Sequence, residues 1–480
     1  MQELLDRALN AASAAGATHA EARVVTTTSE NYEVKDGAPA AAAHAADEGL
    51  CVRAIANGAW GFAAVQDLSL EGAERAARQA IEIAKASAAA AKEPVKLADA
   101  PKVDGAYVTP HDVDPIAVPV EEKIGLLMAA ERAMHGRPHV SITQAFMAVI
   151  RKRTLFASSE GSRYDQTIYE TGGGIAATAV KDGESQVRSY PNSFRGNFST
   201  AGFEYFKSLG LEREAPRVAD EAEALLSAPV CPEGSRDIIL EGGQLGLQVH
   251  ESIGHPIELD RVFGTEAAFA GTSFLTTDQL GSFRYGSRHV NVVADATVPG
   301  ALGSFKWDDE GVRAQSVPII DRGVFVGYIS DRESAARLGM ASSGAARADG
   351  YGAIPLVRMT NINLLPGGWE FDDLLADTGG GLYFVTNRSW SIDDMRINFQ
   401  FGTEAAYEIK GGKLSTMYKN PSYTGITPEF WGSCDAVCSE KHWKVFGTPN
   451  CGKGEPMQSA HVGHGVAPAR FRNVRVGVVR

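Results

Sequence analysis

The 480-residue chain has the composition of a folded protein, with 44% hydrophobic and 22% charged residues. Its length exceeds one ordinary compact core and predicts two or three domains. The formal net charge of -13 and the lack of a clustered basic face exclude nucleic acid as an expected partner. The 51 glycines exceed the usual share of about 7%. They favour many tight turns and hence a β-rich portion.

The sequence also bears on where the protein acts. No stretch approaches the roughly 18 uninterrupted apolar residues that a membrane span needs. Residues 1–17 contain early acidic side chains and no apolar core of a secretory signal. Five cysteines, an odd number in a long chain, fit a reducing compartment better than a disulfide framework. We therefore expect a cytoplasmic protein with no membrane partner.

The first part of the chain predicts helices and an antiparallel sheet. Asn57-Gly58 stands between two apolar runs, which is the strongest short hairpin signal. Apolar spacing and alternation predict, in chain order, a helix over 1–15, two strands within 19–37, a hairpin over 49–65, a helix over 69–92 and a linker over 92–110. We predict that residues 1–110 form an N-terminal α/β domain.

Another unit begins with a helix over 119–136, which has acidic residues in its first turn and Gly136 at its end. Residues 139–190 then alternate as strands and break at glycine-containing turns, as in a meander. A charged helix over 211–227 follows. This pattern predicts a middle helix-plus-meander domain over 111–230.

Residues 231–480 form the third predicted domain, which is β-rich and has hairpins at 321–331 and 407–417. Within this β-rich domain we also predict one helix, which follows the strand Asp237–Leu240 and carries a metal-binding motif. The predicted fold class is α+β. An N-terminal α/β layered region contains an antiparallel sheet, and a β-rich C-terminal domain carries the metal-binding helix.

That motif is "HESIGH", residues 250–255, which resembles the H-E-x-x-H pattern of zinc hydrolases with one extra residue. In a regular α-helix, a spacing of five turns His250 and His255 roughly 140° apart, too far to share one ion. A π-bulge or unwinding at Gly254 would bring them back together. Glu251 lies between them, where a carboxylate can take the proton of a metal-bound water.

A catalytic zinc needs a third protein ligand and an open position. The side chains that could supply the ligand are Glu258, Asp260, Cys434, Cys438, His442, Cys451, His461 and His464. We expect Cys434 and Cys438 to be buried free thiols, and His461 and His464 to be loop or strand residues. Cys451 stands out because glycine and proline on both sides, in "PNCGKGEPMQ", would hold a thiolate in a rigid turn. Spacing alone leaves the choice open.

With these motifs, the chain resembles the TldD/PmbA family of metallopeptidases, specifically its TldD-like catalytic branch. The resemblance rests on "HESIGHPIELD" and the late "NCGKGEPMQ", with softer matches in "GLCVRAIANGAWGFA" and "FGTEAAFAGTSF". The similarity runs from about residue 5 to the C-terminus, and the order of the motifs is the same throughout.

The resemblance implies a Zn2+ site of His250, His255 and Cys451, with Glu251 as the general base. It implies a zinc-dependent peptidase in which Glu251 activates a zinc-bound water inside a dimeric chamber. The dimer would be a homodimer or a heterodimer with a motif-less TldE/PmbA-like relative. The implied substrates are unfolded or short peptides, such as leader peptides or an antitoxin.

Two other functions compete with this prediction. The chain could be a non-catalytic subunit or scaffold of a peptidase complex, in which case it need hold no zinc. It could also hydrolyse another amide, such as a small peptide conjugate. Lys453 is a candidate for holding the oxyanion, although a solvated turn residue is the favoured interpretation. Trp390, Trp431 and Trp443 are interpreted as core or interface residues in preference to the walls of a peptide groove.

Overall fold

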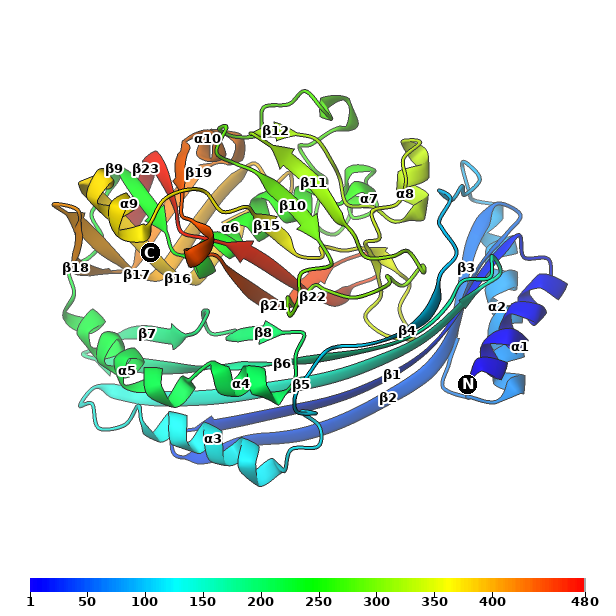
Figure 1. The fold of residues 1–480 in the computed structure, drawn as a ribbon, viewed down its shortest axis with the longest axis horizontal. Helices are drawn as coiled ribbons and strands as arrows, with labels where there is room; N and C mark the ends of the chain where they lie inside the picture. The colour runs from blue at the N-terminus through cyan, green and yellow to red at the C-terminus, as the bar shows by residue number, and fades with distance from the viewer. Residues whose placement is uncertain (479–480) are drawn as a thin grey trace.

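The computed structural model describes residues 1–478. A long, curved and mostly antiparallel sheet spans the molecule, and the C-terminal half of the chain lies over its concave side (Figure 1). We call these two parts the long sheet and the C-terminal domain. The chain runs from helices at one end of the long sheet, through the sheet, and then into the C-terminal domain.

The long sheet has eight strands: six lie in the order β3-β2-β1-β5-β6-β4, and the other two, β7 and β8, pair with β6. Its strands are β1 (His19–Lys35), β2 (Ala38–Ala56), β3 (Ala59–Val65), β4 (Asp104–Val108), β5 (Val140–Ser158), β6 (Arg163–Lys181), β7 (Glu184–Tyr190) and β8 (Asn197–Ser199). Strands from both sides of residue 110 therefore belong to one sheet. The domain boundaries near 110 and 230 stay predictions.

The observed strands confirm one turn and correct two expectations. Asn57 and Gly58 have φ values of 53° and 78° and join β2 to β3, as the hairpin signal predicted. The prediction of two strands within 19–37 is wrong, because β1 is one continuous strand up to a turn at Asp36-Gly37. The segment 92–110 is not a free linker, since β4 adds a parallel strand beside β6.

Helices cover both ends of the long sheet (Figure 1). These are α1 (Gln2–Ala14) and α2 (Leu70–Ala88) at one end, and α3 (Val120–Arg132), α4 (Phe203–Ser208) and α5 (Leu211–Ser227) at the other. The α2 face that meets the sheet is made mostly of alanines, so helix and strand approach closely. A Cβ on Gly61 of β3 would clash with the Ala80 carbonyl oxygen, which explains the glycine at this contact.

The C-terminal domain is built around a seven-stranded sheet in the order β16-β9-β23-β19-β17-β18, with β20 beside β23. Its strands are β9 (Gly234–Leu240), β16 (Gly380–Ile392), β17 (Asn398–Lys410), β18 (Lys413–Lys419), β19 (Pro421–Ile426), β20 (Cys434–Val437) and β23 (Ala469–Val478). Because β16 also pairs with β17, the path closes on itself. This domain is strand-rich, as predicted, and the α+β fold class is confirmed.

Smaller elements complete the C-terminal domain. The strands are β10 (Val292–Asp295), β11 (Ser316–Asp321), β12 (Val324–Phe325) and β15 (Ile362–Leu364) in one sheet, and the pairs β13 (Ala346–Arg347) with β14 (Leu356–Val357) and β21 (Lys444–Lys453) with β22 (Gln458–Val466). The α-helices are α6 (Gly242–Val249), α7 (Leu259–Val262), α8 (Arg332–Arg337), α9 (Phe371–Thr378) and α10 (Thr427–Gly432). In the described part of the chain, no helix combines the length and the apolar character that crossing a membrane requires.

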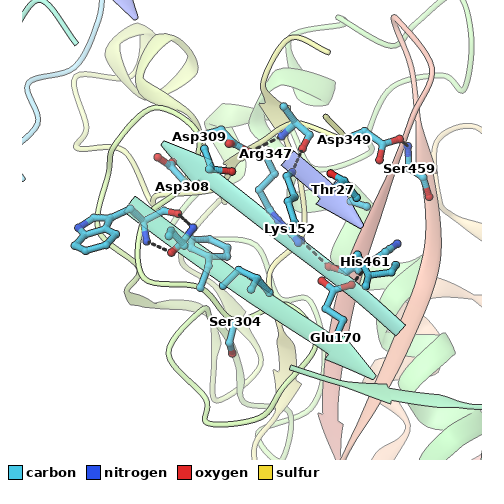
Figure 2. Close-up of a pocket in the computed structure, with 18 of the residues that line it drawn as sticks. Thr27, Lys152, Glu170, Ser304, Asp308, Asp309, Arg347, Asp349, Ser459 and His461 are labelled. Carbon is cyan, nitrogen blue, oxygen red and sulfur yellow. Dashed lines mark hydrogen bonds and ion pairs between the residues drawn. The ribbon is translucent and has the colours of Figure 1, made fainter. Parts of the chain in front are cut away.

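A cavity of about 280 Å³ lies between the long sheet and the C-terminal domain, and we call it the interface cavity (Figure 2). Thr27, Lys152 and Glu170 line it from the sheet, while Arg347 and His461 line it from the C-terminal domain. Its charged side chains bond across the two parts: Lys152 Nζ donates to the Ala348 carbonyl at 2.6 Å, and the His461 ring bonds to the Glu170 carboxylate. These contacts join the two layers.

Candidate metal centre

The helix that carries the histidines is irregular where the motif requires it. Helix α6 follows β9, begins with Glu241 accepting from the Gln244 backbone N–H at 3.2 Å, and is buried along its whole length. It continues as a π-helix over His250–Gly254 and a 3-10 turn over His255–Ile257. The five-residue spacing predicted such a distortion, and the structure confirms it. A Cβ on Gly254 would clash with the Met359 sulfur, so glycine lets this turn pack.

The distortion brings His250 and His255 together with Cys451, which lies on β21. One ligand atom from each residue lies within 4.8 Å of the other two, and all three side chains are buried. Cys451 Sγ lies 3.8 Å from His255 Nε2. Two imidazoles and one thiolate form a donor set that zinc uses in catalytic sites and that leaves a fourth position open. The residues therefore fit a metal ion.

Hydrogen bonds on the far side of each imidazole fix the orientation of the histidines. His250 Nδ1 lies 2.8 Å from His464 Nε2, and His464 Nδ1 lies 3.3 Å from the Ile362 carbonyl oxygen. His255 Nδ1 lies 3.0 Å from the Glu258 carboxylate. Such partners are typical of metal-binding histidines, because they set the tautomer and leave the other ring nitrogen for the ion.

The electrostatic environment favours the protonation states that bind metal. Burial lowers the pKa of His250 to about 4, so the ring is neutral near pH 7. Burial opposes ionisation of the Cys451 thiol, but His255 and Arg358 outweigh it and lower the pKa of Cys451. A neutral imidazole and a thiolate are the ligand forms that a metal ion requires.

Glu251 lines the same cleft and is held by Arg396. The Nη1 of Arg396 donates to Glu251 Oε2 at 2.6 Å. Burial acts to raise the pKa of Glu251, but His250, His255 and Arg396 together lower it. The carboxylate is therefore ionised and oriented beside the cluster. The cleft has a volume of about 360 Å³, and we call it the metal cleft.

Lys453 corrects one sequence-based interpretation. It is a fully buried side chain, not a solvated turn residue. Its Nζ donates to Asp260 at 2.7 Å and to the Val357 carbonyl at 2.6 Å, and lies 3.5 Å from Glu258. Lys453 does not line the metal cleft. Together with Glu258 and Asp260 it forms a buried charged cluster that supports His255 from behind.

The other candidate ligands lie elsewhere. Cys434 and Cys438 are buried free thiols, as expected. His461 and His464 are on β22, which agrees with the prediction that they are loop or strand residues, and His442 pairs with Glu370. His464 nonetheless touches the cluster, and the spacing in "HVGHG" did not reveal this role.

The three tryptophans occupy different environments. Trp431 is completely buried, and its Nε1 donates to Ser252 Oγ at 2.9 Å, which agrees with the core interpretation. Trp443 is partly buried, and its indole donates to the Leu364 carbonyl at 3.0 Å. Trp390 is different, because it is 37% exposed and lines the metal cleft. Trp390 is therefore not a core residue, and the alternative that it lines a groove agrees with its position.

Arg195 reaches the metal cleft from the segment between β7 and β8, which belongs to the long sheet. The cleft is therefore composite, with walls from both parts of the protein. Sequence reasoning missed Arg195 and Arg396, because neither belongs to a recognisable motif and both reach the cleft only through tertiary packing.

Comparison with known proteins agrees with this geometry. Family models match the chain in three stretches, described as PmbA/TldA metallopeptidase domain 1 at 20–84, the central domain at 113–226 and the C-terminal domain at 233–477. The chain belongs to the PmbA/TldD family of metallopeptidases. The resemblance on which the sequence analysis relied is confirmed, and the chain is a metallopeptidase by family.

Curated relatives of this family carry consistent names. A metalloprotease of Methanocaldococcus jannaschii is 32% identical, over 93% of this chain and 94% of the relative. A metalloprotease TldD homolog of Haemophilus influenzae is 27% identical, over 93% of this chain and 90% of the relative. A zinc metalloprotease TldD homolog of Saccharolobus solfataricus is 25% identical, over 51% of this chain and 52% of the relative.

Solved structures show the same fold. A protein from Thermotoga maritima superimposes with a TM-score of 0.78 at 16% identity, covering 99% of this chain and all of that one. TldE from Thermococcus kodakarensis gives a TM-score of 0.69 at 14% identity, covering 99% of this chain and all of that one. At these identities the likeness concerns the fold alone.

Proposed function

We propose that this protein is a zinc-dependent peptidase in which His250, His255 and Cys451 hold the ion and Glu251 is the general base. The observation that carries the proposal is the convergence of these three ligand atoms within 4.8 Å, in a cleft that Glu251 also lines. When bound, zinc supplies Lewis acidity and lowers the pKa of water towards about 7. One of the relatives is named a zinc metalloprotease.

The protein groups have distinct tasks in this reaction. Glu251 accepts a proton from the water that attacks the scissile carbonyl carbon, and then delivers it to the leaving nitrogen. Arg396 orients the Glu251 carboxylate through its 2.6 Å hydrogen bond. His464 and Glu258 hold the two ligand histidines in the orientation that exposes Nε2 to the cluster.

We propose unfolded or short peptides as substrates, of the leader-peptide or antitoxin type. The bulged strand β21, which carries Cys451, pairs with β22 and with no other strand among residues 1–478. Its residues Thr448, Asn450 and Gly452 line the cleft, so an extended peptide could lie along this edge. We further propose that the cleft opens into the chamber of a dimer, formed with a second copy or with a motif-less TldE-like relative. TldE is the name of one of the fold neighbours.

The test is cleavage of an unstructured peptide mixture, read by mass spectrometry, with zinc measured in the same samples. We expect Glu251→Gln to keep zinc and to lose about 10²–10⁴-fold in rate, the usual contribution of a general base. Glu212→Gln, at an exposed position on α5, is the matched control and should cleave as the wild type does.

Undiminished cleavage by Glu251→Gln would contradict the assigned base. A wild-type protein that binds no zinc and cleaves no peptide, alone or with a TldE-like partner, would instead support the non-catalytic subunit.

A further inference from the structure

Arg195 holds an unusual position in the metal cleft. Its guanidinium carbon lies 4.3 Å from the centre of the Trp390 ring and 4.9 Å from that of Phe194. Its Nε is buried and has no hydrogen-bond partner among residues 1–478. Two aromatic faces thus hold this cation, an arrangement that arginine allows because its planar guanidinium stacks on rings and is weakly hydrated.

Two other arginines, Arg396 in the same cleft and Arg188 on β7, are held by acids, although Arg396 Nε also has no partner among residues 1–478. Arg396 donates to Glu251 at 2.6 Å, and Arg188 pairs with Glu404 and Glu221, both at 2.9 Å. A buried polar group without a partner is costly, so native proteins leave few of them. No acid among residues 1–478 holds the Arg195 guanidinium, and Arg195 lines the metal cleft, so its terminal N–H groups are available to a molecule bound there.

The charges around Arg195 indicate that the cleft favours a bound group with negative charge. Burial lowers the pKa of Arg195, while the nearby charges of Glu251 and Cys451 act in the opposite direction. The two anions are matched by two guanidinium groups, so a divalent ion leaves the loaded cleft cationic. A cationic cleft stabilises negative charge that appears there during a reaction.

We propose that Arg195 is a catalytic residue that donates a hydrogen bond to the scissile carbonyl oxygen as it becomes negatively charged. This inference rests on the proposed peptidase function. The attacking water oxygen bonds to the carbonyl carbon, and the π-electron pair moves onto the carbonyl oxygen, where Arg195 stabilises it. The C=O double bond then re-forms, the C–N bond breaks, and the nitrogen takes the proton from Glu251.

The inference assigns Arg195 a role across the interface between the two parts of the protein. Trp390 comes from β16 of the C-terminal domain, whereas Arg195 comes from the segment that leads to β8 of the long sheet. Stacking fixes the plane of the guanidinium without using its N–H groups, which an acid would occupy. The long sheet would thus complete the active site and not merely enclose it.

The experiment compares Arg195→Ala and Arg195→Lys with the wild type, using Arg288→Gln at an exposed position as the matched control. We expect Arg195→Ala to lower kcat by about 10²–10³-fold, the usual loss for one oxyanion donor, with little change in KM. Arg195→Lys should recover part of the rate. Zinc content and melting temperature should stay at the wild-type values.

A binding measurement separates this role from structural packing. A phosphinic peptide carries a tetrahedral anionic group in place of the scissile amide, so Arg195→Ala should weaken its binding far more than that of the matched amide peptide. Equal weakening of both ligands, or a rise in KM at unchanged kcat, would overturn the proposal. So would a loss that disappears when the C-terminal carboxylate of the substrate is amidated, because Arg195 would then bind that carboxylate.

Peptide cleavage by the wild-type protein tests the peptidase function independently of the role of Arg195. If wild type cleaves peptides and Arg195→Ala cleaves them equally well, only the Arg195 role fails. If wild type cleaves nothing and binds the phosphinic peptide no more tightly than the amide peptide, the peptidase function fails and the Arg195 role fails with it.

Discussion

The metal cleft and the interface cavity have similar volumes, about 360 and 280 Å³, and charged side chains line both. In the interface cavity, Lys152, Arg347, Glu170 and His461 have hydrogen-bond partners within the protein (Figure 2). Arg347 Nη1 donates to the His461 carbonyl at 2.7 Å, and the Glu170 carboxylate accepts from the His461 ring. In the metal cleft, Arg195 keeps a buried Nε with no partner in the described chain, and three ligand atoms converge.

Buried charged groups are bonded differently in these two places. Where the long sheet meets the C-terminal domain, paired charges hold the two parts together. At the metal cleft, incompletely paired groups face a cavity, where a metal ion and a substrate can complete their bonding. The same residue types therefore join the two parts in one place and, under the proposed function, bind metal and substrate in the other.

The largest expected effect is a loss of folding stability when an arginine is removed from a buried ion pair. Arg188 on β7 donates to Glu404 on β17 and to Glu221, and its side chain is only 5% exposed. Arg188→Met leaves the buried Glu404 carboxylate without its cation, whereas Glu221 keeps its ion pair with Arg217 at 3.0 Å. The loss at Glu404 should cost about 3–5 kcal/mol of unfolding free energy. Denaturant unfolding measures the loss, and zinc content should not change.

Combining Arg188→Met with Glu404→Met provides the control. Removing both charges should restore part of the lost stability, because no uncompensated carboxylate then remains at position 404. An Arg188→Met protein as stable as the wild type would show that the ion pair with Glu404 does not stabilise the fold. A loss of zinc in this variant would show that the ion pair and the metal cleft are not independent.

A smaller effect is expected at the hydrogen bond behind the metal cluster. His464→Leu removes the partner of His250 Nδ1, so zinc affinity should fall by about 10–100-fold, as for other partners of ligand histidines. His464→Gln keeps an acceptor and should lose less. Competition with a chromophoric chelator measures both affinities. Equal affinities for the wild type and His464→Leu would mean that His464 only packs against the cluster.

The parts of the fold that could be predicted from the sequence are those with local causes. The Asn57-Gly58 turn needs only positive φ at two residues, and the π-helix at His250–Gly254 is what a five-residue spacing demands if two histidines share an ion. The alanine-rich first half of β2, residues 38–48, was missed because exposed alanines give no alternating pattern.

The site itself depends on distant contacts. Cys451 lies 196 residues from His255 in the sequence, so spacing could not select it among the candidate ligands. The family resemblance selected it. The sequence did not indicate Arg195 or the role of His464 as the partner of His250. Both depend on the packing of the segment before β8 and of the strand β22 beside α6 and the π-helix. Such contacts are set by the tertiary fold and not by any short motif.

The most direct test of the central claim is zinc X-ray absorption on the purified protein and on Cys451→Ser. We expect two nitrogen ligands at about 2.0–2.1 Å and one sulfur at about 2.3 Å in the wild type. The sulfur shell should be absent in Cys451→Ser, whose zinc should be weakly held. A wild-type spectrum without sulfur, or a sulfur shell that persists in Cys451→Ser, would contradict the assignment of His250, His255 and Cys451 as the metal ligands.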